Sequence, residues 1–145
     1  MKKNSYLLSL EVESKTMSLM ELTNIVGKEA SEDSFNKNDI DGLGHRVQLS
    51  VWKSQYVDME EDIDVSKAFK IWRESGLSAF LDDERECKDV SVCLNIGVFF
   101  KTACVTVELP YDHLAILAKR KISCVITSYP CSNDEGEKND SNSPL

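Results

Sequence analysis

The sequence has few of the residues on which catalysis usually depends. It contains two histidines, His45 and His113, and neither has an evident catalytic partner. His113 follows Asp112, but neighbours in a helix do not face one another, so we expect His113 to be exposed to solvent. Gly42 and Gly44 lack the third glycine, the preceding strand and the following helix of a phosphate-binding loop. Because a nucleophile normally needs a base held beside it, we expect no enzymatic activity, no catalytic residue and no cofactor.

The cysteine spacing of a metal site is also missing. The five cysteines are an odd number, and no two of them stand in a C-x-x-C arrangement. We therefore expect no zinc site, and we interpret the thiols as small buried side chains in a reducing compartment. Three of them fall inside predicted strands: Cys93, Cys104 and Cys124.

One polar segment is similar to a calcium-binding loop only in part. Asp39, Asp41 and Gly42 match its third, fifth and sixth positions. Lys37 and Gln48 stand at the first and twelfth positions, where the loop needs a carboxylate and a bidentate glutamate. The sequence therefore predicts no metal site here.

Basic charge and long apolar runs are scarce. The 145 residues include 25 acidic and 17 basic side chains, which gives a net charge of −8 and a pI near 4.8. Nucleic acids and anionic membrane surfaces would repel such a chain, whereas a basic protein would be attracted. No apolar run approaches the roughly 20 residues that a membrane-spanning helix needs. We expect a cytoplasmic protein without a cleaved leader, with no nucleic-acid or membrane partner.

What the chain does have is a clear pattern between residues 89 and 129. The first part alternates, and one face of an extended strand carries the apolar residues Val90, Val92, Leu94, Ile96, Val98 and Phe100. After a turn at residues 101–102, a second strand is predicted from the continuing apolar residues Ala103, Val105 and Val107. Pro110 then opens a helix, and residues 122–129 form the last strand.

The first quarter of the chain predicts a strand, a helix and a loop. The strand runs from Tyr6 to Val12, with apolar and polar residues in alternation. Ser18 and Glu21 have the spacing of a capping box, and Gly27 stands where a left-handed helix end is expected. Residues 28–44 are polar and rich in Asn, Asp, Ser and Gly, so we expect a long surface loop.

The next segment predicts a strand from residue 46 to residue 56 and then a second helix. Val47, Leu49 and Val51 are expected to face inward, which places Trp52 on the opposite, less apolar face. The helix has core residues at helical spacing, namely Val65, Ala68, Phe69 and Trp72. Gly76 weakens or ends it, before the apolar residues Leu77, Phe80 and Leu81.

Together these elements predict an α+β fold in the order β-α-β-α-β-β-α-β. We expect residues 1–131 to form a single domain, with a mostly antiparallel sheet of about five strands and three helices mainly on one face. Residues 132–145 are acidic, polar and without periodicity, so we expect a disordered tail.

Two surfaces are candidates for binding. The open face of the sheet is expected to carry aromatic and amide side chains, which favours a protein-interaction patch; a covering loop or a dimer partner would explain the same pattern. Acidic segments before and after the second helix suit a cationic partner, although plain solubility is the commoner reason for such segments. The candidate partner-binding residues are Asp58, Glu60, Glu61, Asp62, Asp82, Asp83, Glu84, Glu86, Trp52, Asn95 and Phe99.

The order of the elements resembles an uncharacterised bacterial family that is filed as a domain of unknown function. The resemblance rests on Leu8 and Leu10, on Leu22 to Gly27, on Trp52 with Ser54, and on Leu114 to Tyr129. The sequence departs from the family pattern at Arg120, Lys121 and Ile122, where a glycine is expected between helix and strand. The resemblance implies no activity, and it implies a small acidic protein of a kind that includes immunity proteins paired with secreted toxins.

Three functional hypotheses follow. The first is an immunity protein that neutralises a basic, nuclease-like toxin domain by charge complementarity and occlusion. The second is a small-molecule or peptide-binding module that uses the open sheet face around Trp52. The third is a structural dimer joined through the sheet or an edge strand, and we expect a monomer or a weak homodimer.

Overall fold

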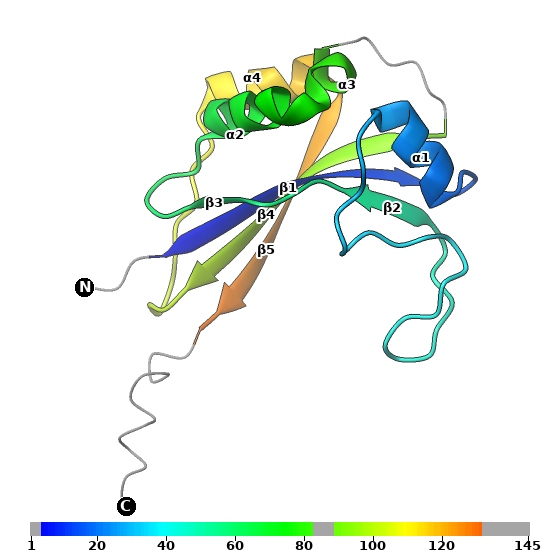
Figure 1. The fold of residues 1–145 in the computed structure, drawn as a ribbon. Coiled ribbons are helices and arrows are strands. Elements are labelled where there is room, and N and C mark those ends of the chain that lie inside the picture. Colours follow the sequence, from blue (N-terminus) through cyan, green and yellow to red (C-terminus); the bar gives the residue numbers. More distant parts are fainter. Residues whose placement is uncertain (1–3, 83–88, 132–145) are drawn as a thin grey trace, which may run out of the picture.

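One five-stranded mixed sheet lies at the centre of the fold, and the helices lie above one of its faces (Figure 1). This is the computed structural model of the chain, and it describes residues 4–82 and 89–131. The expected tail at 132–145 and the acidic residues Asp83, Glu84 and Glu86 lie outside the described residues. The predicted α+β arrangement, with its helices on one face, is confirmed.

The central strand of the sheet is β1. The elements run along the chain as β1 (Ser5–Ser14), α1 (Leu19–Val26), β2 (Ser50–Lys53), β3 (Val57–Met59), α2 (Val65–Trp72), the π-helical turn η1 (Arg73–Leu77), α3 (Ser78–Asp82), β4 (Ser91–Phe100), α4 (Tyr111–Lys119) and β5 (Ile122–Pro130). One side of β1 pairs antiparallel with β2 and β3 in succession, and the other side pairs antiparallel with β4. The last strand, β5, runs parallel to β4.

The capping box predicted for the first helix is present. The Ser18 hydroxyl accepts from the backbone N–H of Glu21 at 3.1 Å, and the Glu21 carboxylate accepts from the Ser18 N–H at 2.8 Å. Gly27 ends α1 with a φ of 81°, in the left-handed region that glycine adopts without a steric penalty. Both ends of α1 are therefore specified by local sequence alone.

The strand predicted around residues 103–109 is wrong. Residues 101–110 form no strand, and the fifth strand is the short β3 instead. Val105, Val107 and Leu109 alternate because they pack against the core from outside the sheet. A parallel partner for β4 needs a crossover rather than a hairpin, and residues 101–121, including α4, supply it.

The single strand predicted from residue 46 to residue 56 is also wrong, because β2 and β3 are separated by a break at Ser54. The Ser54 N–H donates to the Leu10 carbonyl at 2.9 Å, and the Leu10 N–H donates to the Ser54 hydroxyl at 2.9 Å. The side chain thus supplies the acceptor that a regular strand would provide with its carbonyl. The break leaves Gln55 and Tyr56 outside the ladder and lets β3 resume beside β1.

Trp52 lies in the core, which corrects its predicted position on the less apolar face. It stands opposite Val12 in the β1–β2 register, and it is only 1% exposed. Its indole N–H donates to the Lys28 carbonyl at 2.9 Å. Val51 on the other face is buried too, because Phe35 of the long loop pairs with it. Both faces of β2 are therefore covered.

The second helical region agrees with its predicted pattern. The core-facing residues of α2 are buried, and so are the three apolar residues that follow Gly76: Val65, Ala68, Phe69, Trp72, Leu77, Phe80 and Leu81. Trp72 packs edge-on against Phe69 at 5.8 Å between ring centroids. Its indole N–H donates to the Gln55 carbonyl at 3.2 Å, which ties the helix to the break after β2.

Candidate protein-interaction surface

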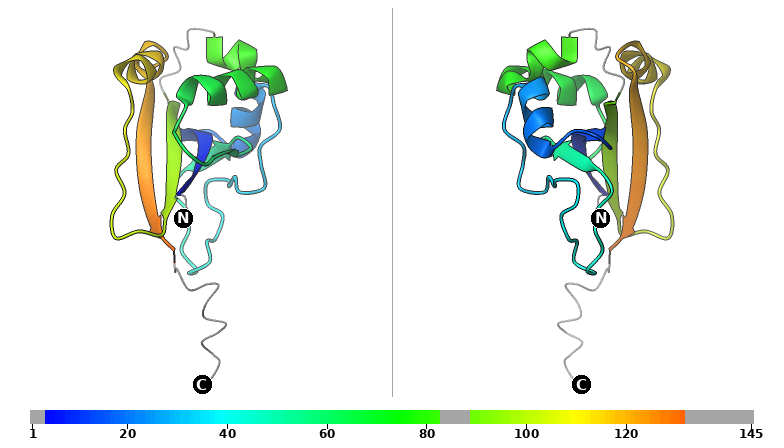
Figure 2. Two further views of the ribbon diagram at one scale, coloured as in Figure 1. Left: turned by 90° about the vertical axis from the view of Figure 1, so that its left-hand side faces the viewer. Right: turned by 90° about the vertical axis from the view of Figure 1, so that its right-hand side faces the viewer.

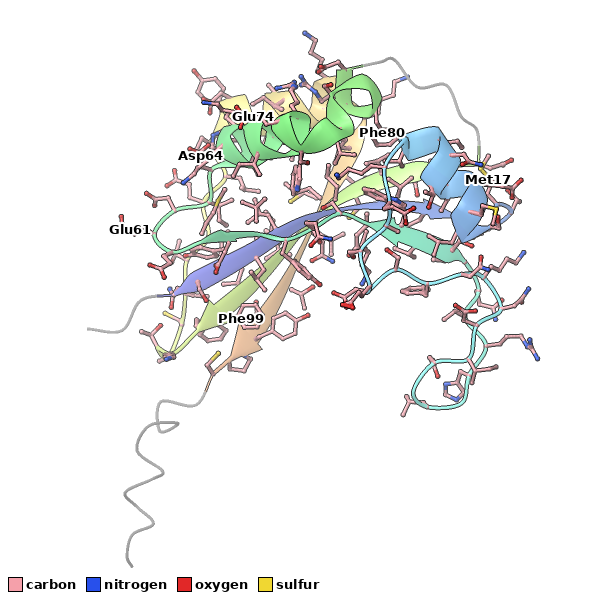
Figure 3. All side chains as sticks on the ribbon, viewed as in Figure 1. Met17, Glu61, Asp64, Glu74, Phe80 and Phe99 are labelled. Carbon is pink, nitrogen blue, oxygen red and sulfur yellow. The ribbon has the colours of Figure 1, made fainter. Side chains whose placement is uncertain are left out.

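The face of the sheet that the helices leave open carries two of the predicted site residues, Asn95 and Phe99. The register places Phe99 between Ser5 of β1 and Tyr129 of β5, and Asn95 between Ser9 and Val125. Figure 3 shows Phe99 on the side of the sheet away from the helices. Alternation within a strand therefore predicted this face correctly for β4.

An aromatic pair lies on this face. The rings of Phe99 and Tyr129 stack at 4.8 Å between centroids, with 14° between their planes. Both rings lie over Gly97, since a Cβ placed there would be 3.4 Å from Phe99 and 3.5 Å from Tyr129. Tyr129 remains 46% exposed. A flat, rigid aromatic pair of this kind can anchor a partner at a low cost in conformational entropy.

Acidic and amide groups lie on the same face, further along the strands from the aromatic pair. The Asn95 amide donates to the Glu11 carboxylate at 3.0 Å, and Lys53 Nζ lies 4.0 Å from the same carboxylate. Burial, with the charge of Glu11 beside it, raises the pKa of Glu13. Burial, with the charges of Glu11 and Glu13, raises the pKa of the Cys93 thiol to about 11. This part of the open face therefore carries two neighbouring carboxylates, one of which is paired with Lys53.

The acidic run that precedes α2 begins on the same face. Asp58 of β3 stands opposite Leu7 of β1, and Leu7 stands opposite Gly97, the glycine beneath the aromatic pair. Adjacent strands are about 4.8 Å apart, so Asp58 in β3 and Gly97 in β4 are separated by two strand spacings, with β1 between them. Glu60, Glu61 and Asp62 follow, all exposed, in the loop whose end Figure 3 marks with Glu61.

We name this combined surface the acidic–aromatic face and define it by Asp58, Glu60, Glu61, Asp62, Asn95, Phe99 and Tyr129. Asp58, from the acidic run, thus shares a face with the aromatic pair, and Glu60, Glu61 and Asp62 follow it in the loop towards α2. The reason is the pairing of β3 with β1, which brings Asp58 to the same end of the sheet as Phe99.

Asp82 does not join this face. It ends α3 on the helix side, where its carboxylate accepts from Arg73 at 2.9 and 3.1 Å and lies 3.9 Å from Arg120. Its charge is balanced within the chain, so it is a poor candidate for contact with a cationic partner. The remaining three predicted acidic residues of that segment lie outside the described residues.

His113 is not the solvent-exposed side chain that its sequence position predicts. Only 14% of it is exposed, and its Nε2 lies 3.8 Å from Asp64, the residue that caps α2. The imidazole therefore lies beside the acid that caps another helix, whereas the Asp112 carboxylate accepts from the His113 backbone N–H at 3.1 Å. His113 Nδ1 is buried without a hydrogen-bond partner in the described part of the chain. His45, by contrast, lies exposed in the long loop.

The cavities are small. One of about 120 Å³ lies beside both tryptophans and is lined in part by Tyr56 and Ile71. Another, of about 270 Å³, lies between the end of β1 and the start of β4. Pockets for small-molecule ligands usually measure about 300–1,000 Å³. The cavity beside Trp52 can therefore admit a group the size of one side chain.

Two residues of the open face were missed by the sequence patterns. Glu11 falls on the polar side of the first strand, so alternation could have placed it beside Asn95 once the strand register was known. The exposure of Tyr56 was missed because the sequence predicts one strand from residue 46 to residue 56. It stands in the break, 48% exposed, where burial and a hydrogen bond to Asp33 raise its pKa.

Two properties of the described residues bear on metal and membrane binding. Within residues 4–82 and 89–131, no three His, Cys, Asp or Glu side chains gather as a metal site requires. In the same part of the chain, every helix is too short or too polar to cross a bilayer. Comparisons with known protein families, with curated proteins and with solved structures find no match. The resemblance to a family of unknown function stays a prediction.

Proposed function

We propose that this chain is an immunity-type inhibitor, which binds a basic toxin domain through the acidic–aromatic face and blocks its active site. The observation that supports the proposal most directly is the position of Asp58. Its pairing with Leu7 puts Asp58, the first residue of the acidic run, on the face that carries the stacked Phe99 and Tyr129. Negative charge and a partly exposed aromatic anchor on one face are a combination suited to a basic protein partner.

Each part of the surface has a distinct role in this proposal. The exposed carboxylates of Asp58, Glu60 and Asp62 attract the basic partner over long range and raise the association rate. The aromatic pair is the anchor, because its apolar area is already held in place and loses little freedom on binding. A nuclease active site binds a polyanion, so an acidic surface can occupy it in place of the substrate.

The test is co-expression with the product of the adjacent gene, followed by pull-down and affinity measurement at low and high salt. The diagnostic variant is Asp58→Asn with Glu60→Gln. The matched control is Glu74→Gln with Glu108→Gln, two exposed acids elsewhere that cause the same change in net charge. Figure 3 shows Glu74 on the helix side of the molecule.

We expect the diagnostic pair to slow association by about tenfold at low salt, while the control changes it little. Phe99→Ala is expected to raise the dissociation rate and to cost about 2 kcal/mol of binding free energy. Equal effects of the two charge pairs would show that net charge, and not this face, governs binding. If the chain forms no complex with the adjacent gene product, the proposal is wrong.

The alternative of a ligand-binding module around Trp52 has less support. Trp52 is buried and faces the helices, so it offers no platform on the open face. The cavity beside it has a volume of about 120 Å³, well below that of a metabolite site.

A further inference from the structure

The two edges of the sheet are protected very differently. Along β2 the long loop pairs with the outer edge: Phe35 and Val51 exchange backbone hydrogen bonds of 3.1 and 2.9 Å, and the Ser31 N–H donates to the Lys53 carbonyl at 2.9 Å. The Lys53 N–H in turn donates to the Ser34 hydroxyl at 2.8 Å. This edge cannot accept another strand without losing those bonds.

The opposite edge, β5, is bare. Its backbone pairs with β4 on one side, and within the described residues no backbone hydrogen bond is made on the other. Residues 101–110 pass near this margin of the sheet (Figure 2), yet none of them exchanges a backbone hydrogen bond with β5. Alternate residues of this nine-residue strand therefore point backbone N–H and C=O groups outward, where no other strand pairs with them in the described part of the chain.

The sequence of β5 has none of the usual protection of an edge strand. Natural edges are blunted by charged residues, bulges or a covering segment. Residues Ile122–Pro130 carry no charge at all, in a chain of which 29% is charged, and proline stands only at the end. Apolar side chains are half exposed on both faces of the strand, with Val125 at 46% on the open face and Ile126 at 44% on the helix face.

We propose that β5 is a self-association edge, at which β5 of a second copy pairs antiparallel about a two-fold axis and joins the two sheets into one. A two-fold perpendicular to the sheet at Ile126 places Tyr129 opposite Ser123 of the second copy, and Val125 opposite its Thr127. Residues of the open face then meet residues of the open face. Such pairing supplies backbone hydrogen bonds and covers the half-exposed apolar side chains.

Charge is the reason that the occupant is a second copy. Two molecules of net charge −8 repel one another wherever acidic surfaces meet, and β5 is an edge strand without charge. A basic partner gains nothing from a neutral edge, whereas a neutral, β-branched strand is complementary to itself. An interface made of one strand pair is small, so the dimer is expected to be weak and concentration-dependent.

The experiment is sedimentation of the full chain over about 1 to 300 µM, a range suited to a weak, small interface. Ile126→Lys and Ile126→Glu each place like charges opposite one another at the axis, and each is expected to weaken the dimer by at least tenfold. An equimolar mixture of the two variants pairs opposite charges and is expected to restore it. Leu43→Lys and Leu43→Glu are the matched controls, since Leu43 is 82% exposed in the long loop.

Thermal unfolding of each variant checks that it folds, and Ser128→Lys provides a second disruption at an exposed position if Ile126→Lys does not fold. A monomeric wild type at the highest concentration would overturn the proposal. So would a dimer that the β5 variants leave intact, or one that the Leu43 variants weaken equally. If dimerisation returns when Ile126→Lys and Ile126→Glu are mixed, and in neither variant by itself, the antiparallel contact at Ile126 is identified.

Discussion

Cys93 is a residue whose chemistry depends on where the sheet places it. It stands on the open face opposite Glu11, and burial together with two neighbouring carboxylates raises its pKa to about 11. The thiolate is the reactive form, so a thiol with a pKa two units above the reference value of 9.0 has about one hundredth of the thiolate at pH 8. Cys93 is therefore suited to packing and not to redox or nucleophilic chemistry.

We predict that iodoacetamide alkylates Cys93 about 100-fold more slowly at pH 8 than an ordinary thiol. The rate should rise with pH up to about 11, because the deprotonated fraction grows through the raised pKa. Mass spectrometry of the alkylated peptides measures the rate, with the exposed Cys104 as the internal reference. The two cysteines should react at similar rates only after denaturation. Similar rates in the folded protein would show that the pKa of Cys93 is not raised.

Residue patterns predicted side-chain direction only where a strand is unbroken. Asn95 and Phe99 lie within β4, which is ten residues of unbroken strand, and their face was predicted correctly. Trp52 was placed on the wrong face for two reasons. Counting from Val47 assumed that Arg46 to Tyr56 was one strand, and it assumed that one face of that strand was wet. In fact Val51 on the second face is buried, and Phe35 of the long loop pairs with it.

Gly76 shows how one backbone position connects two helical elements. Its φ of 115° interrupts the helical geometry between α2 and α3, and the apolar residues on both sides of it face the same core. A Cβ at this position would approach no atom closer than 3.8 Å, at Lys28. The cost of a side chain here is therefore one of backbone strain and not of collision.

We predict that Gly76→Ala lowers the free energy of unfolding by about 1–3 kcal/mol, because alanine is strained at this φ. Gly42→Ala is the control, since it has open space around it and no positive φ, and it is expected to change stability by less than about 0.5 kcal/mol. Urea unfolding midpoints measure both. Equal midpoints for the two variants would show that the junction relaxes freely.

Elements with a local signal were predicted well, and elements that depend on distant partners were not. The caps of α1 and the periodicity of α2 lie within the sequence of each helix. The short strand β3 has three residues, and it exists because β1 extends past the end of β2. Residues 103–109 alternate as a strand does, yet the parallel arrangement of β4 and β5 leaves them outside the sheet. Alternation of apolar and polar residues therefore indicates which side chains are buried, and it does not indicate whether the segment pairs with another strand.

For the whole molecule, the two proposed interactions use different forces and different directions. The acidic–aromatic face lies on the surface of the sheet, whereas the β5 edge lies in its plane (Figure 1). A dimer formed through β5 therefore leaves the acidic–aromatic faces of both copies open. Long-range charge attraction dominates the first interaction, whereas backbone hydrogen bonds and apolar contact dominate the second.

Salt should consequently separate the two interactions. Raising the ionic strength from 0.1 M to 1 M shortens the screening length from about 10 Å to about 3 Å. The attraction between the acidic–aromatic face and a basic partner weakens under that screening. The repulsion between two copies of net charge −8 weakens as well, while the uncharged β5 contact loses nothing. We therefore predict that salt dissociates the complex with the adjacent gene product and strengthens self-association of the chain alone. Sedimentation of both samples across the salt series measures the two effects. A dimer that dissociates as salt rises would show that charged groups, and not β5, form the contact between the two copies.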